Sequence, residues 1–309
     1  MTIAPATTSI HYSDFEDSTS LLGDAEALRS KGKADGYLFF KGLLPYEDVI
    51  KVRDAVYSVL MKEGSLSDDK GAVSRDYIDA IDRDDMRLDI GVSNEGYATV
   101  QKVMGVHALP HHPALLALYR ELFGTPVFVH PRHIVRAMTG HPALRPTPAH
   151  QDFPLIQGSQ NTWTAWFPLD DCPVKRGPLS VLRGSNHDGY FPIAAAEGAG
   201  GLEALLCRDD VDWVSQGFSI GDVLTFPSLT VHRAVPATQK DRLRLSMDIR
   251  FQPFDEPIEA KSLTNHSDRP WDEIYEGWES DDFQYYWNSS YPKLSPWDDS
   301  YLQPGVRIC

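Results

Sequence analysis

Cysteine is scarce in this chain, and long apolar runs and basic clusters are missing. The three cysteines, Cys172, Cys207 and Cys309, form no CxxC pair and no even framework, which indicates a reducing, cytoplasmic setting. No run approaches the ~18 apolar residues of a membrane-spanning helix. Acidic residues outnumber basic ones by 44 to 29, and the net charge is −15. Nucleic acids and anionic membranes are therefore not expected partners.

Internal repeats and low-complexity linkers are also missing, so we expect a single domain over residues 1–309. Residues 1–20 have neither the basic nor the apolar segment of a secretory leader and are expected to form a short N-terminal arm. The core is expected over residues 20–255. An extension rich in aromatic and acidic residues, 256–309, is expected to pack its rings against the outside or the mouth of that core.

Helices are predicted in the N-terminal third of the chain and strands in the middle. Helices are expected over residues 24–36, 45–64 and 112–124, where apolar residues recur at helical spacing and glycine ends each segment. Beyond residue 126, short strand-like runs alternate with turn residues, which predicts an antiparallel barrel or jelly roll. The acidic segment 65–95 is poorly patterned and is expected to be a long excursion, either a solvated loop or a lid.

Two His-x-Asp triplets, at 150–152 and 266–268, raise the question of a metal site. Chance alone would place about 1.6 His-x-acid triplets in a chain of this composition, so neither is evidence by itself. If the first triplet lies on a strand, His150 and Asp152 point to the same face. His232 offers a third ligand, and two histidines with one carboxylate form the facial triad that suits non-haem Fe(II). Nothing downstream completes the second triplet, which we expect to be structural.

A second polar pattern follows in the run DRLRLSMDIRF. Arg242, Arg244, Ser246 and Asp248 share one face of the expected strand. An arginine on an inward strand face needs an anionic partner, and a bound dicarboxylate offers a bidentate one. An arginine with a hydroxyl two residues later suits the distal carboxylate of 2-oxoglutarate. The pattern favours Arg244 for this role and keeps Arg242 as its rival.

Together these motifs resemble the phytanoyl-CoA dioxygenase family of Fe(II)/2-oxoglutarate-dependent oxygenases, and within it the bacterial natural-product hydroxylases. The resemblance rests on the 150–152 triplet, WFPL, RGPLSVLRGS, GDVLTF, His232 and RLRLSMDIRF, and it spans roughly residues 20–255. It implies a mainly β fold with flanking helices and a double-stranded β-helix (jelly-roll, cupin-like) core. One departure is RGSNH at 183–187, where family members usually read Pro-Gly-Ser-His; we expect it to alter only a turn.

The resemblance also implies roles for single residues. His150, Asp152 and His232 would bind the iron, and Arg244 with Ser246 would bind 2-oxoglutarate. Related halogenases carry a small residue at the position of Asp152, which leaves room for chloride on the iron. The intact carboxylate here favours hydroxylation.

Three further residues have two interpretations each. Trp166 matches a position that lines the cosubstrate pocket, and it could equally be plain core. Arg136 is a candidate anchor for a substrate carboxylate, with Arg132 as a second candidate. The alternative for Arg136 is an ion pair at the rim of the barrel.

The expected function is hydroxylation of an unactivated C–H bond in a small organic substrate, in secondary metabolism. Fe(II) is the expected metal, 2-oxoglutarate and O2 are the expected cosubstrates, and succinate and CO2 are released. The same site could serve desaturation, epoxidation or cyclisation. Rivals of another class are a non-oxygenase metal-binding, cupin-like protein and a silent binding protein. The only expected partner is the small molecule, and the sequence predicts no oligomeric state.

Overall fold

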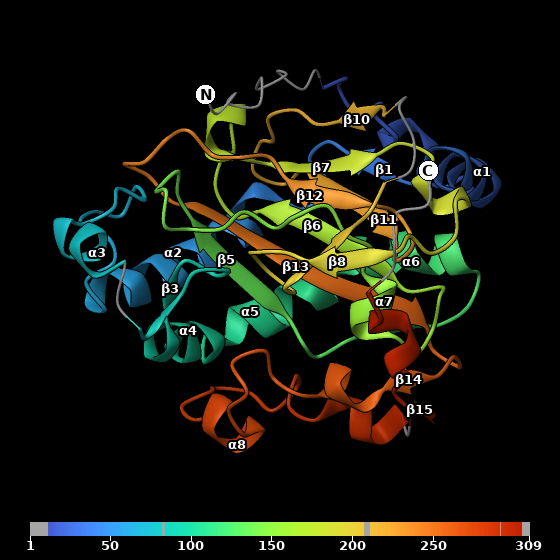
Figure 1. The fold of residues 1–309 in the computed structure, drawn as a ribbon. Coiled ribbons are helices and arrows are strands. Elements are labelled where there is room, and N and C mark those ends of the chain that lie inside the picture. Colours follow the sequence, from blue (N-terminus) through green and yellow to red (C-terminus); the bar gives the residue numbers. More distant parts are fainter. Residues whose placement is uncertain (1–11, 82–83, 207–210, 291, 305–309) are drawn as a thin grey trace, which may run out of the picture.

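Six antiparallel strands form the larger of two main sheets. The computed structural model describes residues 12–81, 84–206, 211–290 and 292–304. The sheet has the strand order β1 (Leu38–Phe40), β11 (Val223–Pro227), β6 (Trp163–Pro168), β13 (Arg244–Pro253) and β4 (Val127–Val129), and β5 (Ile134–Met138) also pairs with β13. The long strand β13 therefore contacts three others and lies at the centre of the molecule (Figure 1).

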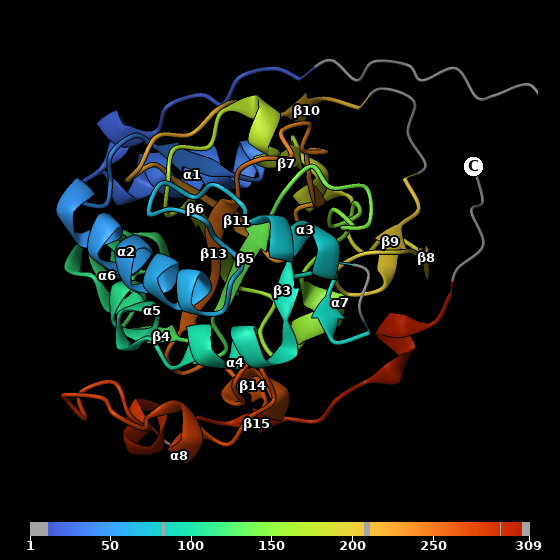
Figure 2. The ribbon, with the colours of Figure 1, turned by 90° about the vertical axis from the view of Figure 1, so that its left-hand side faces the viewer.

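Polar and apolar residues alternate along the central strand β13, so the two faces of the larger sheet differ in polarity there. In β13 the odd-numbered residues from Leu245 to Phe251 join the main apolar core. The even-numbered residues from Arg244 to Gln252 are polar and point to the opposite face. Helices cover the apolar face, on one side of the sheet in Figure 2. They are α1 (Ala25–Asp35), α2 (Tyr46–Lys62), α4 (Asn94–Gln101), α5 (Met104–Ala108) and α6 (Pro113–Phe123).

A smaller sheet packs on the other face of the larger one. It has the strand order β10 (Trp213–Val214), β7 (Leu179–Leu182) and β12 (His232–Ala234). An apolar cluster with Trp166, Leu224 and Phe226 from the larger sheet and Val181 and Val214 from the smaller one fills the space between them. The prediction of a mainly β protein with flanking helices is confirmed.

The three predicted helices occur where their end signals lie. The Asp24 side chain accepts a hydrogen bond from the Ala27 N–H at 3.0 Å and begins α1. Gly36 and Gly124 end α1 and α6 with φ of 74° and 72°, a left-handed conformation that glycine adopts without steric cost. Helix α2 spans most of the predicted 45–64 segment.

Segment 65–95 is better folded than its sequence suggests. It contains α3 (Arg75–Ala80), β2 (Met86–Arg87) and β3 (Val92–Ser93), and residues 82–83 lie outside the described ranges. Its scattered apolar side chains are buried in the main core. They are Leu66, Tyr77, Ile81, Ile90 and Val92. A purely solvated loop is therefore the wrong description, since irregularly spaced anchors tie the segment to the core.

The C-terminal extension packs along the outside of the core. It carries β14 (Ile258–Glu259), α8 (Trp271–Ile274) and β15 (Leu294–Ser295), and it runs along one edge of the molecule in Figure 2. Phe128 of β4 joins an apolar cluster with Ile258, Ile274 and Trp287. Two core histidines complete the contact, because His107 and His111 pack against extension rings at centroid distances of 4.6–5.8 Å.

Three further sequence predictions concern the N-terminal arm, membrane-spanning helices and the three cysteines. Part of the N-terminal arm is described, and the Ser13 N–H donates to the Trp213 carbonyl at 3.0 Å. Across the described ranges, no helix combines the length and hydropathy needed to cross a bilayer. Cys172 is a buried free thiol, whereas Cys207 and Cys309 lie outside the described residues.

Because several histidines are buried, we expect the folded protein to lose stability in acid. Burial lowers the pKa of His107 and of His130 from 6.5 to about 4. The unfolded chain therefore binds more protons between pH 6.5 and pH 4, and the free energy of unfolding falls as the pH drops through that window. Above pH 6.5 this contribution is fully present. We expect the melting temperature to fall across the window, and to fall less steeply in the His107→Gln/His130→Gln variant. Equal slopes for both proteins would contradict this assignment.

Candidate active site

His150, Asp152 and His232 converge on one point next to the cluster between the two sheets. Their candidate ligand atoms all lie within 4.8 Å of one another. The Nε2 atoms of His150 and His232 are 3.8 Å and 3.9 Å from Asp152 Oδ1. All three side chains are buried. Within the part of the chain that the structure describes, no other group of histidines, cysteines and acids meets this geometry.

Backbone pairing brings the two histidines together. The His150 N–H donates to the His232 carbonyl, and the His232 N–H donates to the His150 carbonyl, both at 2.9 Å. Asp152 is not on this bridge. Its backbone is helical (φ −69°, ψ −38°), and it precedes the short helix α7 (Phe153–Ile156). The ligands thus converge as predicted, but the expected regular strand is wrong, because the chain turns into a helix directly after the bridge.

The two histidines present their Nε2 lone pairs to the site. His150 Nδ1 lies 2.8 Å from the Pro148 carbonyl, and His232 Nδ1 lies 3.1 Å from the Thr230 carbonyl. A carbonyl only accepts, so each Nδ1 carries the hydrogen and each Nε2 is free to bind a metal. Burial lowers the pKa of His232 to about 4, which keeps the ring neutral.

Asp152 is held as a carboxylate by two neighbours. The Thr164 hydroxyl donates to Oδ2, and Arg250 Nη2 donates to Oδ1 at 3.0 Å. Burial favours the neutral acid, but the positive charge of Arg250, with His232 and His150, outweighs it and holds the pKa of Asp152 well below its usual range. Asp152 therefore has the charged form that a metal requires of a carboxylate ligand.

This donor set fits a divalent iron. Neighbouring ligands of an octahedral metal lie about 3 Å apart when the bonds are near 2.1 Å. The Nε2–Oδ1 distances of 3.8 and 3.9 Å need only small side-chain movements to reach that spacing. Two imidazoles and one carboxylate on one side of the metal leave three positions for other molecules.

Arg244 and Ser246 form a second polar pair on the same face of β13. Arg244 is 4% exposed, and its Nη1 donates to the Gly177 carbonyl at 2.9 Å. Arg244 Nε and Ser246 Oγ are both buried and have no hydrogen-bond partner within residues 12–81, 84–206, 211–290 and 292–304. Buried polar atoms rarely remain unpaired, so the pair is suited to an anionic ligand. Arg242 lies outside the strand and donates to the Lys70 carbonyl at 2.6 Å.

Trp166 lies directly beside this pair. Its ring belongs to the apolar cluster between the sheets and packs edge-on against Phe218 at 4.8 Å. The Arg244 guanidinium is 5.9 Å from the Trp166 ring centroid, within reach of a cation–π contact. Trp166 thus belongs to the core and also contacts Arg244.

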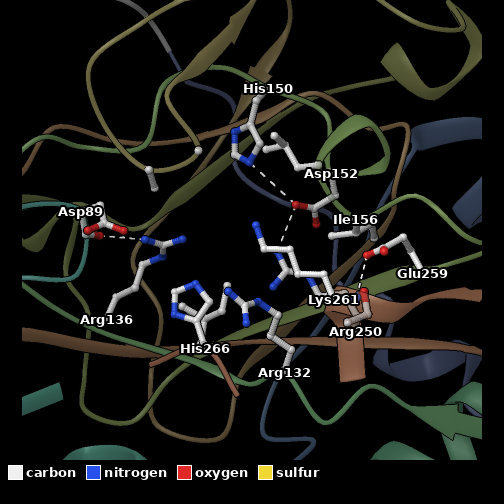
Figure 3. Close-up of a pocket in the computed structure, with 15 residues that line it drawn as sticks. Asp89, Arg132, Arg136, His150, Asp152, Ile156, Arg250, Glu259, Lys261 and His266 are labelled. Carbon is white, nitrogen blue, oxygen red and sulfur yellow. Dashed lines mark hydrogen bonds and ion pairs between the residues drawn. The ribbon is translucent and has the colours of Figure 1, made fainter. Parts of the chain in front are cut away.

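A cavity of about 240 Å³ lies beside the His-Asp-His site (Figure 3). His150 and Asp152 line it. So do four basic side chains, namely Arg132, Arg136, Arg250 and Lys261. Lys261 comes from the C-terminal extension, which therefore supplies one wall. The cavity combines a metal-site edge with four basic side chains, which outnumber its three acidic ones, Asp89, Asp152 and Glu259.

Both arginines singled out in the sequence line this cavity. Arg136 Nε donates to Asp248 Oδ2 at 2.9 Å, and its Nη1 donates to the Asp89 carbonyl at 2.7 Å. Arg132 Nη1 donates to Thr264 Oγ1 at 2.8 Å and to the Asn265 carbonyl at 2.7 Å. The ion-pair interpretation of Arg136 is thus true, and the residue also faces the cavity.

Sequence reasoning missed several residues of the site. Arg250 continues the alternation that begins at Arg244, so extending that pattern would have found it. Thr164 lies two residues before Trp166 on the same face of β6, but no sequence pattern distinguishes it from other buried threonines. No local sequence pattern marks Asp89 or His266 as a cavity residue, because the packing of segments distant in the sequence brings them there.

Known proteins share both the sequence pattern and the fold. Residues 32–243 match the family described as Phytanoyl-CoA dioxygenase (PhyH). The 1-deoxypentalenic acid 11-beta-hydroxylase of Streptomyces arenae is 28% identical over 280 residues, 85% of this chain and 91% of that protein. The protein of the same name from Streptomyces exfoliatus is 28% identical over 276 residues, 84% and 91%.

A solved structure agrees with the fold. The epimerase SnoN, in complex with Fe3+, alpha ketoglutarate and nogalamycin RO, superposes with a TM-score of 0.55 at 22% identity. The match covers 76% of this chain and 86% of SnoN.

A helix-flanked, mainly β fold with a buried His-Asp-His site is the arrangement of a non-haem iron enzyme. The chain belongs to the phytanoyl-CoA dioxygenase family, as its motifs predict. It is therefore an Fe(II)/2-oxoglutarate-dependent oxygenase, with O2 as the second cosubstrate.

The Thr164 hydrogen bond gives a test of the metal site. Partners that orient a metal-binding carboxylate typically contribute 10- to 100-fold to metal affinity. We expect Thr164→Val to weaken Fe(II) binding by about 10-fold, measured by anaerobic titration. Thr225→Val is the matched control, because Thr225 is also buried in the larger sheet but bonds to Tyr119 on the helix side. Equal Fe(II) affinities for the two variants would contradict the role of Thr164.

Proposed function

We propose that the protein hydroxylates an unactivated C–H bond of a small, largely apolar organic acid of secondary metabolism. The observation that carries this proposal is the cavity of about 240 Å³ that joins the His-Asp-His site to a wall of arginines. His150, Asp152 and His232 are the proposed iron ligands. Arg244 and Ser246 are the proposed 2-oxoglutarate anchors.

The antiparallel pairing supports a double-stranded β-helix as the core. The two sheets face each other across an apolar cluster, and the His150–His232 bridge lies at the edge of the smaller one. A jelly-roll core places such an edge over the inner face of the larger sheet. The proposed ligands come from the bridge and the segment after it, and the 2-oxoglutarate anchors come from β13.

Cavity size and charge favour a small acid as substrate. A volume of about 240 Å³ lies just below the range of about 300–1,000 Å³ for small-molecule sites, and it is too small to enclose an acyl-CoA. Guanidinium groups bind carboxylates bidentately. The two relatives at 28% identity are named for hydroxylation of 1-deoxypentalenic acid, which is itself a carboxylic acid. Arg132 and Arg136 are the proposed anchors for the acid group.

The side chains divide the work of the reaction. When bound, Fe(II) and 2-oxoglutarate supply the oxidising chemistry with O2, and 2-oxoglutarate leaves as succinate and CO2. His150, Asp152 and His232 hold the metal on one side and leave the other side open. Arg244 orients the cosubstrate, and the buried location keeps water away from the reacting atoms. The carboxylate of Asp152 favours transfer of a hydroxyl group over transfer of chloride.

Anaerobic titration with Fe(II) and 2-oxoglutarate tests this proposal. A weak visible band near ~520 nm is expected for a ketoacid chelated to iron at a facial triad. We expect the band in the wild type and its loss in His150→Ala and Asp152→Ala. Asp268→Ala, from the second His-x-Asp triplet, is the matched control and should retain it. Iron binding without the band would support the non-oxygenase, cupin-like alternative. If the band forms, succinate release and a product one oxygen atom heavier than the substrate would identify the acids that react.

Arg244 and Arg242 offer a matched pair for the 2-oxoglutarate site. Hydrogen bonds to charged groups contribute roughly 1.5–3 kcal/mol, which corresponds to about 10- to 100-fold in affinity. We expect Arg244→Ala to raise the KM for 2-oxoglutarate by at least about 10-fold. Arg242→Ala should leave it unchanged, because that side chain bonds to Lys70 outside the site. The same KM in both variants would contradict the assignment.

A further inference from the structure

His266 belongs to the extension and forms part of the wall of the cavity. Figure 3 shows its ring between the side chains of Arg136 and Arg132. The ring packs edge-on against Tyr97 at 5.6 Å, and Arg87 Nη1 donates to the His266 carbonyl at 3.2 Å. The residue is therefore held from behind, with the cavity in front of it.

Behind the His266 ring, a chain of hydrogen bonds can run in only one donor-to-acceptor direction. The Ser267 N–H donates to Asn265 Oδ1 at 2.8 Å, so Asn265 Nδ2 is the atom that donates to Gln101 Oε1 at 3.0 Å. Gln101 Nε2 must then be a donor, and it reaches Tyr97 Oη at 3.0 Å and the His133 carbonyl at 3.2 Å. The direction is fixed because a backbone N–H only donates and a carbonyl only accepts.

Tyr97 links this chain to His266 and determines which ring nitrogen carries the hydrogen. Its Oη accepts from Gln101 and lies 2.8 Å from His266 Nδ1. Burial raises the pKa of Tyr97 to about 12, so the hydroxyl keeps its hydrogen and donates it to Nδ1. In a neutral ring the other hydrogen is then on Nε2. Among the described residues, the hydrogen bond of the His266 ring is the one at Nδ1, and no protein group forms one with Nε2.

The neighbouring charges keep the ring neutral. Burial, followed by the charges of Arg132, Arg87 and Arg136, lowers the pKa of His266 well below its usual value. An uncharged imidazole can lie among guanidinium groups without adding to their repulsion. It still presents one N–H donor of fixed direction to the cavity.

We propose that His266 is a specificity-determining residue whose Nε2–H binds one carboxylate oxygen of the substrate. A flanking guanidinium, from Arg132 or Arg136, binds the other oxygen. This inference rests on the proposed function, since it assumes that an organic acid occupies the cavity beside the iron. An ester blocks one oxygen and has no charge, and a primary amide replaces one oxygen with a donor. His266 and the flanking guanidinium should therefore bind acids more tightly than esters or amides.

The test uses the full-length protein, loaded anaerobically with Fe(II) and 2-oxoglutarate, and three probes of one shape. The probes are adamantane carboxylic acid, its methyl ester and its primary amide, and binding is measured by calorimetry. We expect the wild type to prefer the acid and His266→Ala to lose about 10- to 100-fold of that preference. His266→Gln should recover part of it, since its amide N–H reaches the position of Nε2. His187→Ala, an exposed histidine away from the cavity, is the matched control.

A further variant tests the fixed direction of the ring. Tyr97→Phe removes the hydroxyl that donates to Nδ1 and should lower the acid preference by a smaller factor than His266→Ala does. All variants are compared at equal intensity of the iron–ketoacid band, which reports a folded, loaded site.

The outcomes separate the two proposals. If the wild type forms no band, the proposed function fails, and this inference fails with it. If the band forms but the wild type binds acid and ester equally, or binds neither, the carboxylate class is wrong. If the wild type prefers the acid and His266→Ala keeps the full preference with the band intact, His266 has no part in specificity.

Discussion

The two faces of β13 are the constraint on which the rest of the site depends. Its odd-numbered residues are fixed in the helix-covered core, so its even-numbered polar residues must be buried on the opposite face. Buried polar groups need partners, and Asp248 and Arg250 find Arg136 and Asp152. Arg244 Nε and Ser246 Oγ find none among the residues that the structure describes. One strand thus holds Asp152 through Arg250, holds Arg136 of the cavity wall through Asp248, and carries the proposed cosubstrate anchor.

The C-terminal extension completes what the sheets begin. The family match ends at residue 243, and Lys261 and His266 lie beyond it. The extension is fixed in place by ring contacts with His107 and His111 and by the bond between the Tyr286 hydroxyl and the Val129 carbonyl. His150, Asp152 and His232 therefore lie within the family match, whereas Lys261 and His266 of the cavity wall lie beyond it.

Local signals in the sequence were enough to predict the helices and the convergence of the ligands. Asp24 and Gly36 delimit α1 because capping is a short-range interaction. The local shape at Asp152 was predicted wrongly, although Pro154 was a sign of a helix start. His266 was expected to be structural. Its place in the cavity was beyond prediction, because it depends on how the whole extension packs against the core.

Iron-edge anomalous diffraction from crystals grown anaerobically with Fe(II) and 2-oxoglutarate would locate the metal and the cosubstrate together. We expect one iron peak bonded to His150 Nε2, Asp152 Oδ1 and His232 Nε2, with the distal carboxylate of 2-oxoglutarate against Arg244 and Ser246. An iron peak away from these three ligands would contradict it. So would a cosubstrate carboxylate bound by Arg132 or Arg136, because that would place 2-oxoglutarate where the substrate acid is proposed to bind.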